Sequence, residues 1–370
     1  MPVLYKEVKQ SILEYAAQRR PHSRLPSRSE LSKMFFVAKT TVDRAVKELV
    51  EEGYLYSLSG SGTYVADCGT NAFSLKKKEI NAAVLLPNIM HDTYPGILRG
   101  VEDVMQSYGV NVVICNTDND LERQESYLRR LIRSEVSGMI MIPTITVKDS
   151  EGLALSNMLT ELDMPVVFCN RGIPGVTRPL IASNNFYGGY IATKHLLEMG
   201  YERIAFLSSY PYQLTHERFQ GYQAALWENQ REVDNALVRI EEKDNCAETG
   251  YEGARRLLEN ARPDAIFCFN DRLAYGVMNY FYEKNIAVGE EIGVVGYDNT
   301  PSCEMFKPGL TSVSYEEYEN GRRAAEMLME MILKPGNSFQ RLTVTNPRLF
   351  VRGSSRRGGA ERDSMANAIK

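Results

Sequence analysis

Polar side chains follow several apolar runs in the last three quarters of the chain, at the points where the runs end. Carboxylates accept hydrogen bonds from paired hydroxyl groups, and Arg and Asn side chains donate to them. Each residue taken alone could instead serve a loop turn or cap a helix. Together they predict a site for a hydroxyl-rich ligand. The pairs are His91 and Asp92, Asn170 and Arg171, Asn270 and Asp271, and Asp298 and Asn299.

A second group of residues could bind a polyanion. Residues 1–66 contain ten Lys or Arg against seven Asp or Glu, whereas the rest of the chain contains 33 against 40. The basic and hydroxyl side chains within residues 39–44 could contact DNA phosphates, guanine edges or a thymine methyl. The alternative is a solvated helix face on which Arg44 pairs with Glu48.

Signatures of catalysis and metal binding are absent from the sequence. There is no P-loop, no H-E-x-x-H and no G-x-S-x-G motif, and the four His lack metal spacing. Six Cys are scattered without a C-x-x-C pair. We therefore expect a binding protein, not an enzyme, with no cofactor and no metal. The chain shows no membrane-spanning run and no export signal, so a cytoplasmic location without membrane contact is expected.

The basic segment carries the signals of three helices. Apolar residues recur at helical spacing over residues 5–16. Residues 27–30, Ser-Arg-Ser-Glu, form a capping box that predicts a short second helix. An apolar stripe over residues 42–50 predicts a third helix, with Thr40 or Thr41 as its cap.

Two strand-like runs, 54–57 and 63–66, surround a Gly-containing turn after the third helix. Three helices followed by such a hairpin predict a small α/β winged helix-turn-helix, whose third helix enters the major groove. The predicted DNA contacts are Arg28, Lys39, Thr40, Thr41, Arg44, Ser59, Gly60 and Ser61.

The larger part of the chain alternates short apolar runs with helical patterns. Such alternation predicts parallel sheets covered by helices on both faces, and the number of runs favours two lobes. Ligands of these sheets bind beyond the carboxyl ends of the strands, where the polar pairs lie. The runs are residues 82–86, 110–114, 139–142, 165–168, 203–207, 265–268 and 292–295.

Composition places the domain boundaries. We predict a DNA-binding domain over residues 1–66, a polar linker over 67–79 and a two-lobed effector-binding and dimerisation domain over 80–354. Residues 355–370 mix Arg, Gly, Asp and Ser without periodicity, which predicts a disordered tail.

The first domain resembles the GntR family of bacterial regulators. The resemblance implies a winged helix-turn-helix that binds operator DNA. Family members commonly have Arg where this chain has Ser29 and a basic residue where it has Asp43, so no base preference is carried over. The matching stretches are 25–31, 40–42, 49–55 and 60–65.

The second domain resembles the effector domain of the LacI/GalR repressors, which has the type I periplasmic sugar-binding fold. The matching motifs include 170–171, 217–222, 269–271 and 295–300. Asn184 replaces the usual Asp of the family, so a familiar ligand does not follow. The resemblance implies ligand contacts from Asp92, Arg171, Asn185, Arg218, Asn270 and Asp298, and His91 and Tyr94 complete the predicted site.

The order of these two parts resembles that of the arabinose repressors of Gram-positive bacteria. It implies a ligand-responsive transcriptional regulator, a repressor in the usual sense of the family. Its expected partners are double-stranded operator DNA, a carbohydrate effector and a second copy of the chain. The alternatives are a regulator fused to a catalytic domain and a transport-type binding protein. The missing catalytic motifs disfavour the first, and the winged helix disfavours the second.

Overall fold

The computed structural model describes residues 3–58, 61–66, 80–134, 136–144, 153–210 and 213–357. The chain divides into two compact units, Met1–Ile80 and Asn81–Lys370. The predicted linker, 67–79, and the predicted wing residues Ser59 and Gly60 lie outside the described residues. No described helix is long and apolar enough to cross a bilayer.

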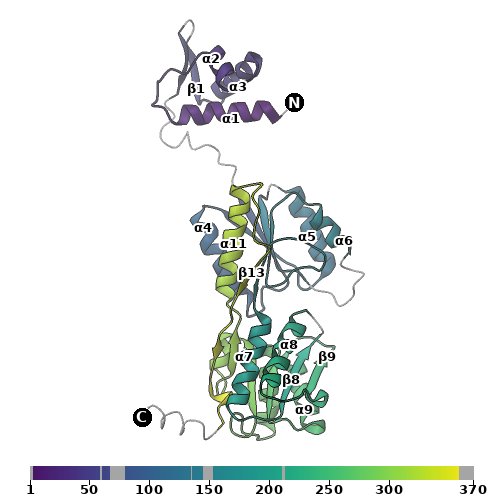
Figure 1. The fold of residues 1–370 in the computed structure, drawn as a ribbon. Coiled ribbons are helices and arrows are strands. Elements are labelled where there is room, and N and C mark those ends of the chain that lie inside the picture. Colours follow the sequence, from purple (N-terminus) through teal and green to yellow (C-terminus); the bar gives the residue numbers. More distant parts are fainter. Residues whose placement is uncertain are drawn as a thin grey trace. The chain divides into compact units, whose positions relative to one another are not determined.

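The first unit has the predicted helices and hairpin (Figure 1). The two strands pair antiparallel, with Leu55 opposite Val65 and Leu58 opposite Gly62. The predicted capping box is present, because the Ser27 hydroxyl accepts from the Glu30 N–H while the Glu30 carboxylate accepts from the Ser27 N–H. The elements are α1 Val3–Ala17, α2 Arg28–Met34, α3 Lys39–Glu51, β1 Leu55–Leu58 and β2 Gly62–Val65.

The start of α3 differs from the prediction. The helix begins at Lys39, and Ala38 is its N-cap, without a side-chain hydrogen bond. Thr40 and Thr41 lie in the first turn and do not cap the helix, so that expectation is wrong. The apolar stripe is confirmed, since Val42 and the residues that follow it at helical spacing are buried. Thr is preferred over Ala at the N-cap position of a helix. The tight turn before α3 nevertheless places Ala38 at that position.

The second unit consists of two α/β lobes (Figure 1). In the first lobe a six-stranded sheet has the order β13-β7-β6-β5-β3-β4, and its neighbouring strands are parallel. Its strands are β3 Asn81–Leu86, β4 Asn111–Asn116, β5 Gly138–Met141, β6 Val166–Cys169, β7 Leu180–Ser183 and β13 Leu342–Thr345. Its helices are α4 Tyr94–Ser107, α5 Leu121–Arg133, α6 Leu153–Thr160 and α11 Glu317–Leu333.

The second lobe repeats this plan with the order β14-β12-β11-β10-β8-β9, and only the β12–β14 pair is antiparallel among its described strands. Its strands are β8 Ile204–Ser209, β9 Val238–Glu241, β10 Ala265–Cys268, β11 Gly293–Asp298, β12 Thr311–Ser314 and β14 Leu349–Phe350. Its helices are α7 Asn185–Glu198, α8 Gln213–Glu228, α9 Ala247–Asn260 and α10 Asp271–Glu283. The predicted fold class is confirmed.

The chain crosses between the lobes three times. It passes from β7 to α7 at Asn184, returns from β12 to α11 through Tyr315 and Glu316, and crosses again from β13 to β14 over residues 346–348. The first lobe is therefore completed by α11 and β13, which follow the second lobe in sequence. Polar residues at the carboxyl ends of strands from both lobes meet near these crossings.

In both lobes, paired helices approach each other at glycines. A Cβ added to Gly276 of α10 would lie 1.7 Å from the Ala247 carbonyl oxygen of α9. One added to Gly321 of α11 would lie 2.1 Å from the Ile97 carbonyl oxygen of α4. Side chains of any size would separate these helices, so the close contacts require glycine.

The C-terminal segment differs from the prediction at its start. Ser355 is buried, its hydroxyl donates to Thr311 Oγ1 at 2.7 Å, and it lies 2.7 Å from Nε2 of His195. Arg357 donates to the Gly200 carbonyl. The expectation of disorder from residue 355 is therefore wrong for 355–357, because local composition does not reveal partners far away in sequence. Residues 358–370 lie outside the described residues.

Deleting residues 355–370 is expected to destabilise the second unit. The deletion removes the partner of the His195 ring and one of the partners of Thr311, and a buried polar group left unpaired costs about 1–3 kcal/mol. Deleting only residues 358–370 retains these bonds and is the control. Thermal unfolding by circular dichroism measures both. Equal midpoints for the two deletions would contradict a structural role for Ser355.

Candidate functional site

The start of α3 presents the polar residues predicted to meet DNA. Lys39 and Thr40 are exposed, Thr41 is partly exposed, and no side chain caps the first turn. Uncapped amides at a helix N-terminus attract anions, phosphate among them. Ser61, in the turn of the hairpin, bonds through its hydroxyl to the Tyr64 hydroxyl at 2.5 Å.

Two predicted DNA contacts are paired within the protein. Arg28 Nη1 lies 3.1 Å from Oδ1 of Asp43. Arg44 Nε lies 3.5 Å from Oε1 of Glu48, and its guanidinium lies 4.4 Å from the ring centre of Tyr5. The structure therefore contains the ion pair between Arg44 and Glu48 that the alternative interpretation of this helix face predicted. The Arg44 side chain is 70% exposed, and such surface pairs contribute only about 0–1 kcal/mol, so DNA could displace it.

Arg218 of α8 is buried in the second lobe and held on several sides. Its Nε donates to Oδ1 of Asn185 at 3.0 Å, and its Nη1 donates to the Phe269 carbonyl. The guanidinium lies 3.5 Å from the ring centre of Tyr297 and 4.4 Å from that of Phe269. Stacking on two rings orients the cation and keeps it out of water.

Asp298, at the end of β11, is a buried carboxyl group without a protein donor. It is 8% exposed, and no hydrogen bond reaches its carboxylate from the part of the chain that the structure describes. Burial raises the pKa of Asp298 well above its usual value, and Arg218 opposes this effect. A buried acceptor without a partner can be satisfied by a bound ligand.

The loop after Asp298 is held in a rare conformation. Asp298 has a φ of 106° and Asn299 a φ of 51°, and such backbone strain costs about 1–3 kcal/mol per residue. The buried Asp271 carboxylate accepts from the Thr300 N–H at 2.8 Å and from the Ser312 hydroxyl at 2.6 Å. These bonds keep the loop, and with it Asp298, in place.

Two of the predicted asparagines hold other parts of the site. Asn270 is the N-cap of α10, and its Oδ1 accepts from the Leu273 N–H at 3.0 Å, so the capping alternative describes this residue. Asn185 Nδ2 donates to the Ser183 carbonyl at 3.0 Å while its Oδ1 accepts from Arg218. Asn185 therefore orients Arg218.

The first lobe contributes residues from the β3–α4 loop and the start of α4. His91 Nδ1 lies 2.9 Å from Thr93 Oγ1, and the ring centres of His91 and Tyr94 are 5.1 Å apart. Burial lowers the pKa of His91 to about 4, so its ring is neutral near pH 7. Asp92 forms an ion pair with Arg272 of the second lobe, at 3.3 Å.

A pocket of about 260 Å³ lies between the lobes, and His91, Asp92, Tyr94 and Asp298 are not among its lining residues. Of the predicted ligand residues, Arg171 and Asn185 line this pocket. Arg218 does not line it, but its side chain donates a hydrogen bond to Asn185. Arg171 Nε donates to the Pro143 carbonyl at 2.8 Å. Further lining comes from Gln213 and Glu217 of the second lobe and from Leu342 and Val344 of the first.

Two family descriptions match the chain. The gntR family of bacterial regulatory proteins matches residues 3–65, and the periplasmic binding protein-like domain matches residues 193–355. The HTH-type transcriptional repressor PurR of Photobacterium profundum is 32% identical over 260 residues, which are 70% of this chain and 76% of that protein. The chain belongs to the LacI/GalR family of ligand-responsive transcriptional repressors.

The DNA-binding domain of this repressor, its reader, is of the GntR type. The arabinose metabolism transcriptional repressor of Geobacillus stearothermophilus is 27% identical over 95% of this chain and 97% of its own. Among solved structures, CcpA of Lactococcus lactis matches with a TM-score of 0.67 and 28% identity, covering 74% of this chain and 98% of that one. A LacI family regulator from Enterococcus faecium with bound ribose matches with a TM-score of 0.64 and 26% identity, with 74% and 98% covered.

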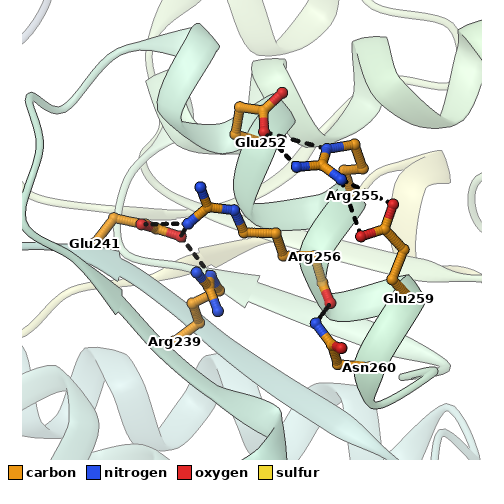
Figure 2. Close-up of polar contacts among 7 residues, drawn as sticks. All are labelled: Arg239, Glu241, Glu252, Arg255, Arg256, Glu259 and Asn260. Atoms are coloured by element: carbon orange, nitrogen blue, oxygen red, sulfur yellow. Dashed lines mark hydrogen bonds and ion pairs between the residues drawn. The ribbon is translucent and has the colours of Figure 1, made fainter.

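An arginine-rich surface of the repressor's second lobe is paired with carboxylates. Figure 2 shows that the arginines on β9 and α9 face carboxylates. Arg256 and Arg239 both contact Glu241, and Arg255 bonds to Glu252 at 2.9 Å and Glu259 at 2.8 Å. Each of these arginines therefore has a carboxylate partner within the protein.

Several residues of the repressor's interlobe site were missed from sequence. Arg272 directly follows the polar pair Asn270 and Asp271, so its position was visible although its partner across the lobes was not. Glu317 and Tyr315 lie at a crossing that no local pattern marks.

Proposed function

We propose that this repressor binds operator DNA as a homodimer in the cytoplasm and that a carbohydrate effector, bound between the two lobes, changes its affinity for DNA. It acts by binding, without a catalytic step. The observation that carries the proposal is the buried, ligand-ready carboxyl group of Asp298 beside the stacked guanidinium of Arg218. Two relatives also support a carbohydrate effector. One is named an arabinose metabolism transcriptional repressor, and the solved structure of the other contains bound ribose.

The effector contacts we propose are divided between the lobes. From the second lobe, Asp298 and Arg218 bind hydroxyl groups, while Asn185 and Asn270 orient neighbouring groups. From the first lobe, Arg171 supplies a donor and the Tyr94 ring an apolar surface, with His91 and Asp92 at its edge. An effector that contacts both lobes favours one of their arrangements, which is the differential affinity a switch requires.

Exposed apolar side chains support dimerisation. In the first lobe, Val113 and Ile114 on the edge strand β4 and Met90 in the β3–α4 loop are exposed. In the second lobe, Tyr282 and Met305 are exposed beside a cavity of about 820 Å³. Exposed apolar side chains such as these can contribute to an interaction surface, and a symmetric dimer places two DNA-binding domains on two half-sites.

In the reader, we propose that Lys39, Thr40 and Thr41 contact DNA directly and that the hairpin turn, residues 59–61, approaches the backbone. We propose that Arg28 and Arg44 also contact the DNA, once phosphate has replaced their carboxylate partners. Replacing Lys39 by Ala is expected to weaken operator binding by about 1–3 kcal/mol if it reads a base, or to reduce the salt slope by about one if it holds a phosphate.

Lys47→Ala is the matched control, because Lys47 lies on the same helix two turns further on and is equally exposed to solvent. The operator is first selected from a pool of random duplexes, and fluorescence anisotropy then measures affinity between 50 and 300 mM salt. Identical curves for wild type and Lys39→Ala would exclude this residue from the interface. Failure of the wild type to select any duplex would refute DNA binding itself.

A further inference from the structure

We infer that the ring of Phe36, in the turn between α2 and α3, contacts the methyl group of a thymine in the major groove of the operator. The contact adds a preference for a T·A pair at one position of each half-site. The inference rests on the proposed entry of α3 into the groove and adds a base contact that no sequence pattern predicted.

Phe36 is an apolar residue that the reader leaves in water. It is 94% exposed, whereas both of its neighbours, Phe35 and Val37, pack against the core of the first unit. A single exposed apolar side chain is common on protein surfaces and would need no explanation by itself. The backbone conformation of Phe36 is a second, independent observation.

The backbone of Phe36 is left-handed, with a φ of 54°. A bulky side chain at positive φ is rare and strained, whereas glycine adopts this conformation freely. Among the described residues other than glycine that have a positive φ, Phe36 is the only one whose side chain has no polar atom. The fold therefore bears this strain for a side chain that supplies neither core packing nor a hydrogen bond, which points to a role in binding.

Hydrogen bonds on both sides of Phe36 fix the turn. The N–H of Phe35 donates to the Leu31 carbonyl at 3.0 Å. The N–H of Val37 donates to the Ser32 carbonyl at 3.1 Å, and the Ser32 hydroxyl donates to the Val37 carbonyl at 2.6 Å. The ring of Phe36 is therefore presented from a braced turn, which lowers the entropy that binding must overcome.

The turn lies next to the end of α3 that we propose enters the groove. Consecutive Cα atoms are about 3.8 Å apart, so those of Phe36 and Lys39 are separated by at most about 11 Å, or roughly three base-pair steps of DNA. Residues 31–42 contain two exposed cations, Lys33 and Lys39, and no Asp or Glu. An exposed ring flanked by cations matches DNA, whose phosphates attract the cations and whose major groove presents an apolar group in the thymine methyl.

The test replaces single thymines of the operator by uracil, which removes only the methyl group. The operator is first selected from random duplexes with the full wild-type chain. Burial of one methyl contributes about fourfold to affinity, so uracil at one position of a half-site should weaken wild-type binding by about this factor. Phe36→Gly, which changes both subunits, should weaken binding to the intact operator about 10- to 100-fold and should be indifferent to uracil at that position.

Two further readouts separate a DNA contact from a loss of folding. Because glycine adopts a positive φ without strain, the melting temperature of Phe36→Gly should not fall below that of the wild type. The ring carries no charge, so binding should keep the wild-type salt slope, unlike that of a variant that loses a phosphate contact. Trp227→Ala is the matched control, because it truncates an aromatic residue of the second unit that is 82% exposed, and it should bind as the wild type does.

Wild-type operator affinity in Phe36→Gly would overturn the inference. So would a weakened variant for which no thymine shows a uracil effect that depends on Phe36, because the ring would then act elsewhere. Both results leave the proposed DNA binding intact. If the wild type selects no duplex, the proposed operator binding fails, and the inference fails with it.

Discussion

Arg218→Ala should abolish the response to effector while operator binding in its absence stays within a few-fold of wild type. The substitution removes the cation that opposes the buried charge of Asp298 and the stacking on Tyr297. Breaking one partner of a buried charge pair costs about 3–5 kcal/mol, equivalent to roughly a 100- to 4,000-fold loss of effector affinity. Release of labelled operator by increasing effector concentrations measures the change.

Two variants sharpen this experiment. Arg203→Ala removes a half-exposed arginine of the same lobe and should behave as wild type. Arg218→Lys keeps the charge but not the planar fork that bonds Asn185 and the Phe269 carbonyl, and it should restore only part of the response. If Arg218→Ala releases DNA at the wild-type effector concentration, Arg218 is not a ligand contact.

Gly276→Ala should cause the largest loss of stability among single methyl additions to the second unit. The new Cβ would lie 1.7 Å from the Ala247 carbonyl oxygen, a backbone atom that cannot rotate away, so α9 and α10 must separate. Overpacking of this kind costs about 1–3 kcal/mol or more, and we expect the melting temperature to fall by roughly 5–10 °C.

Gly172→Ala is the matched control, because its added Cβ would meet its nearest neighbour, Phe168, at an ordinary 3.6 Å. Thermal unfolding followed at 222 nm should show an unchanged midpoint for this variant. A Gly276→Ala protein that melts with the wild type would show that the helix pair tolerates separation without cost.

Much of the fold could be predicted because its signals are local. The capping box at Ser27 and the apolar stripe from Val42 each depend on residues within two or three turns. All seven apolar runs became strands, and six of them are buried parallel strands, which need such a continuous apolar stretch, whereas the edge strand β4 is largely exposed. The strands β7, β9, β12, β13 and β14 were not among the predicted runs, and β9, β13 and β14 have mixed exposure.

The site was predictable in position but not in pairing. The residues after the strands do meet between the lobes, because parallel strands bring their carboxyl ends to one edge. Which of them stay available for ligand depends on partners far away in sequence. Asn270 is used as a helix cap, whereas Asp298 is left without a donor, and no local pattern distinguishes the two.

The three crossings of the chain between the lobes determine how the second unit can be divided into fragments. A break at Asn184 would leave one fragment with most of the first lobe and another with the second lobe plus α11 and β13. Because α11 and β13 complete the first lobe, neither fragment corresponds to a lobe. A cut at either of the other two crossings likewise releases no complete lobe. Neither lobe can therefore be produced as one continuous stretch of the natural chain. A gene that joins the end of β7 directly to the start of α11, with the second-lobe segment between them removed, would be needed to express the first lobe alone.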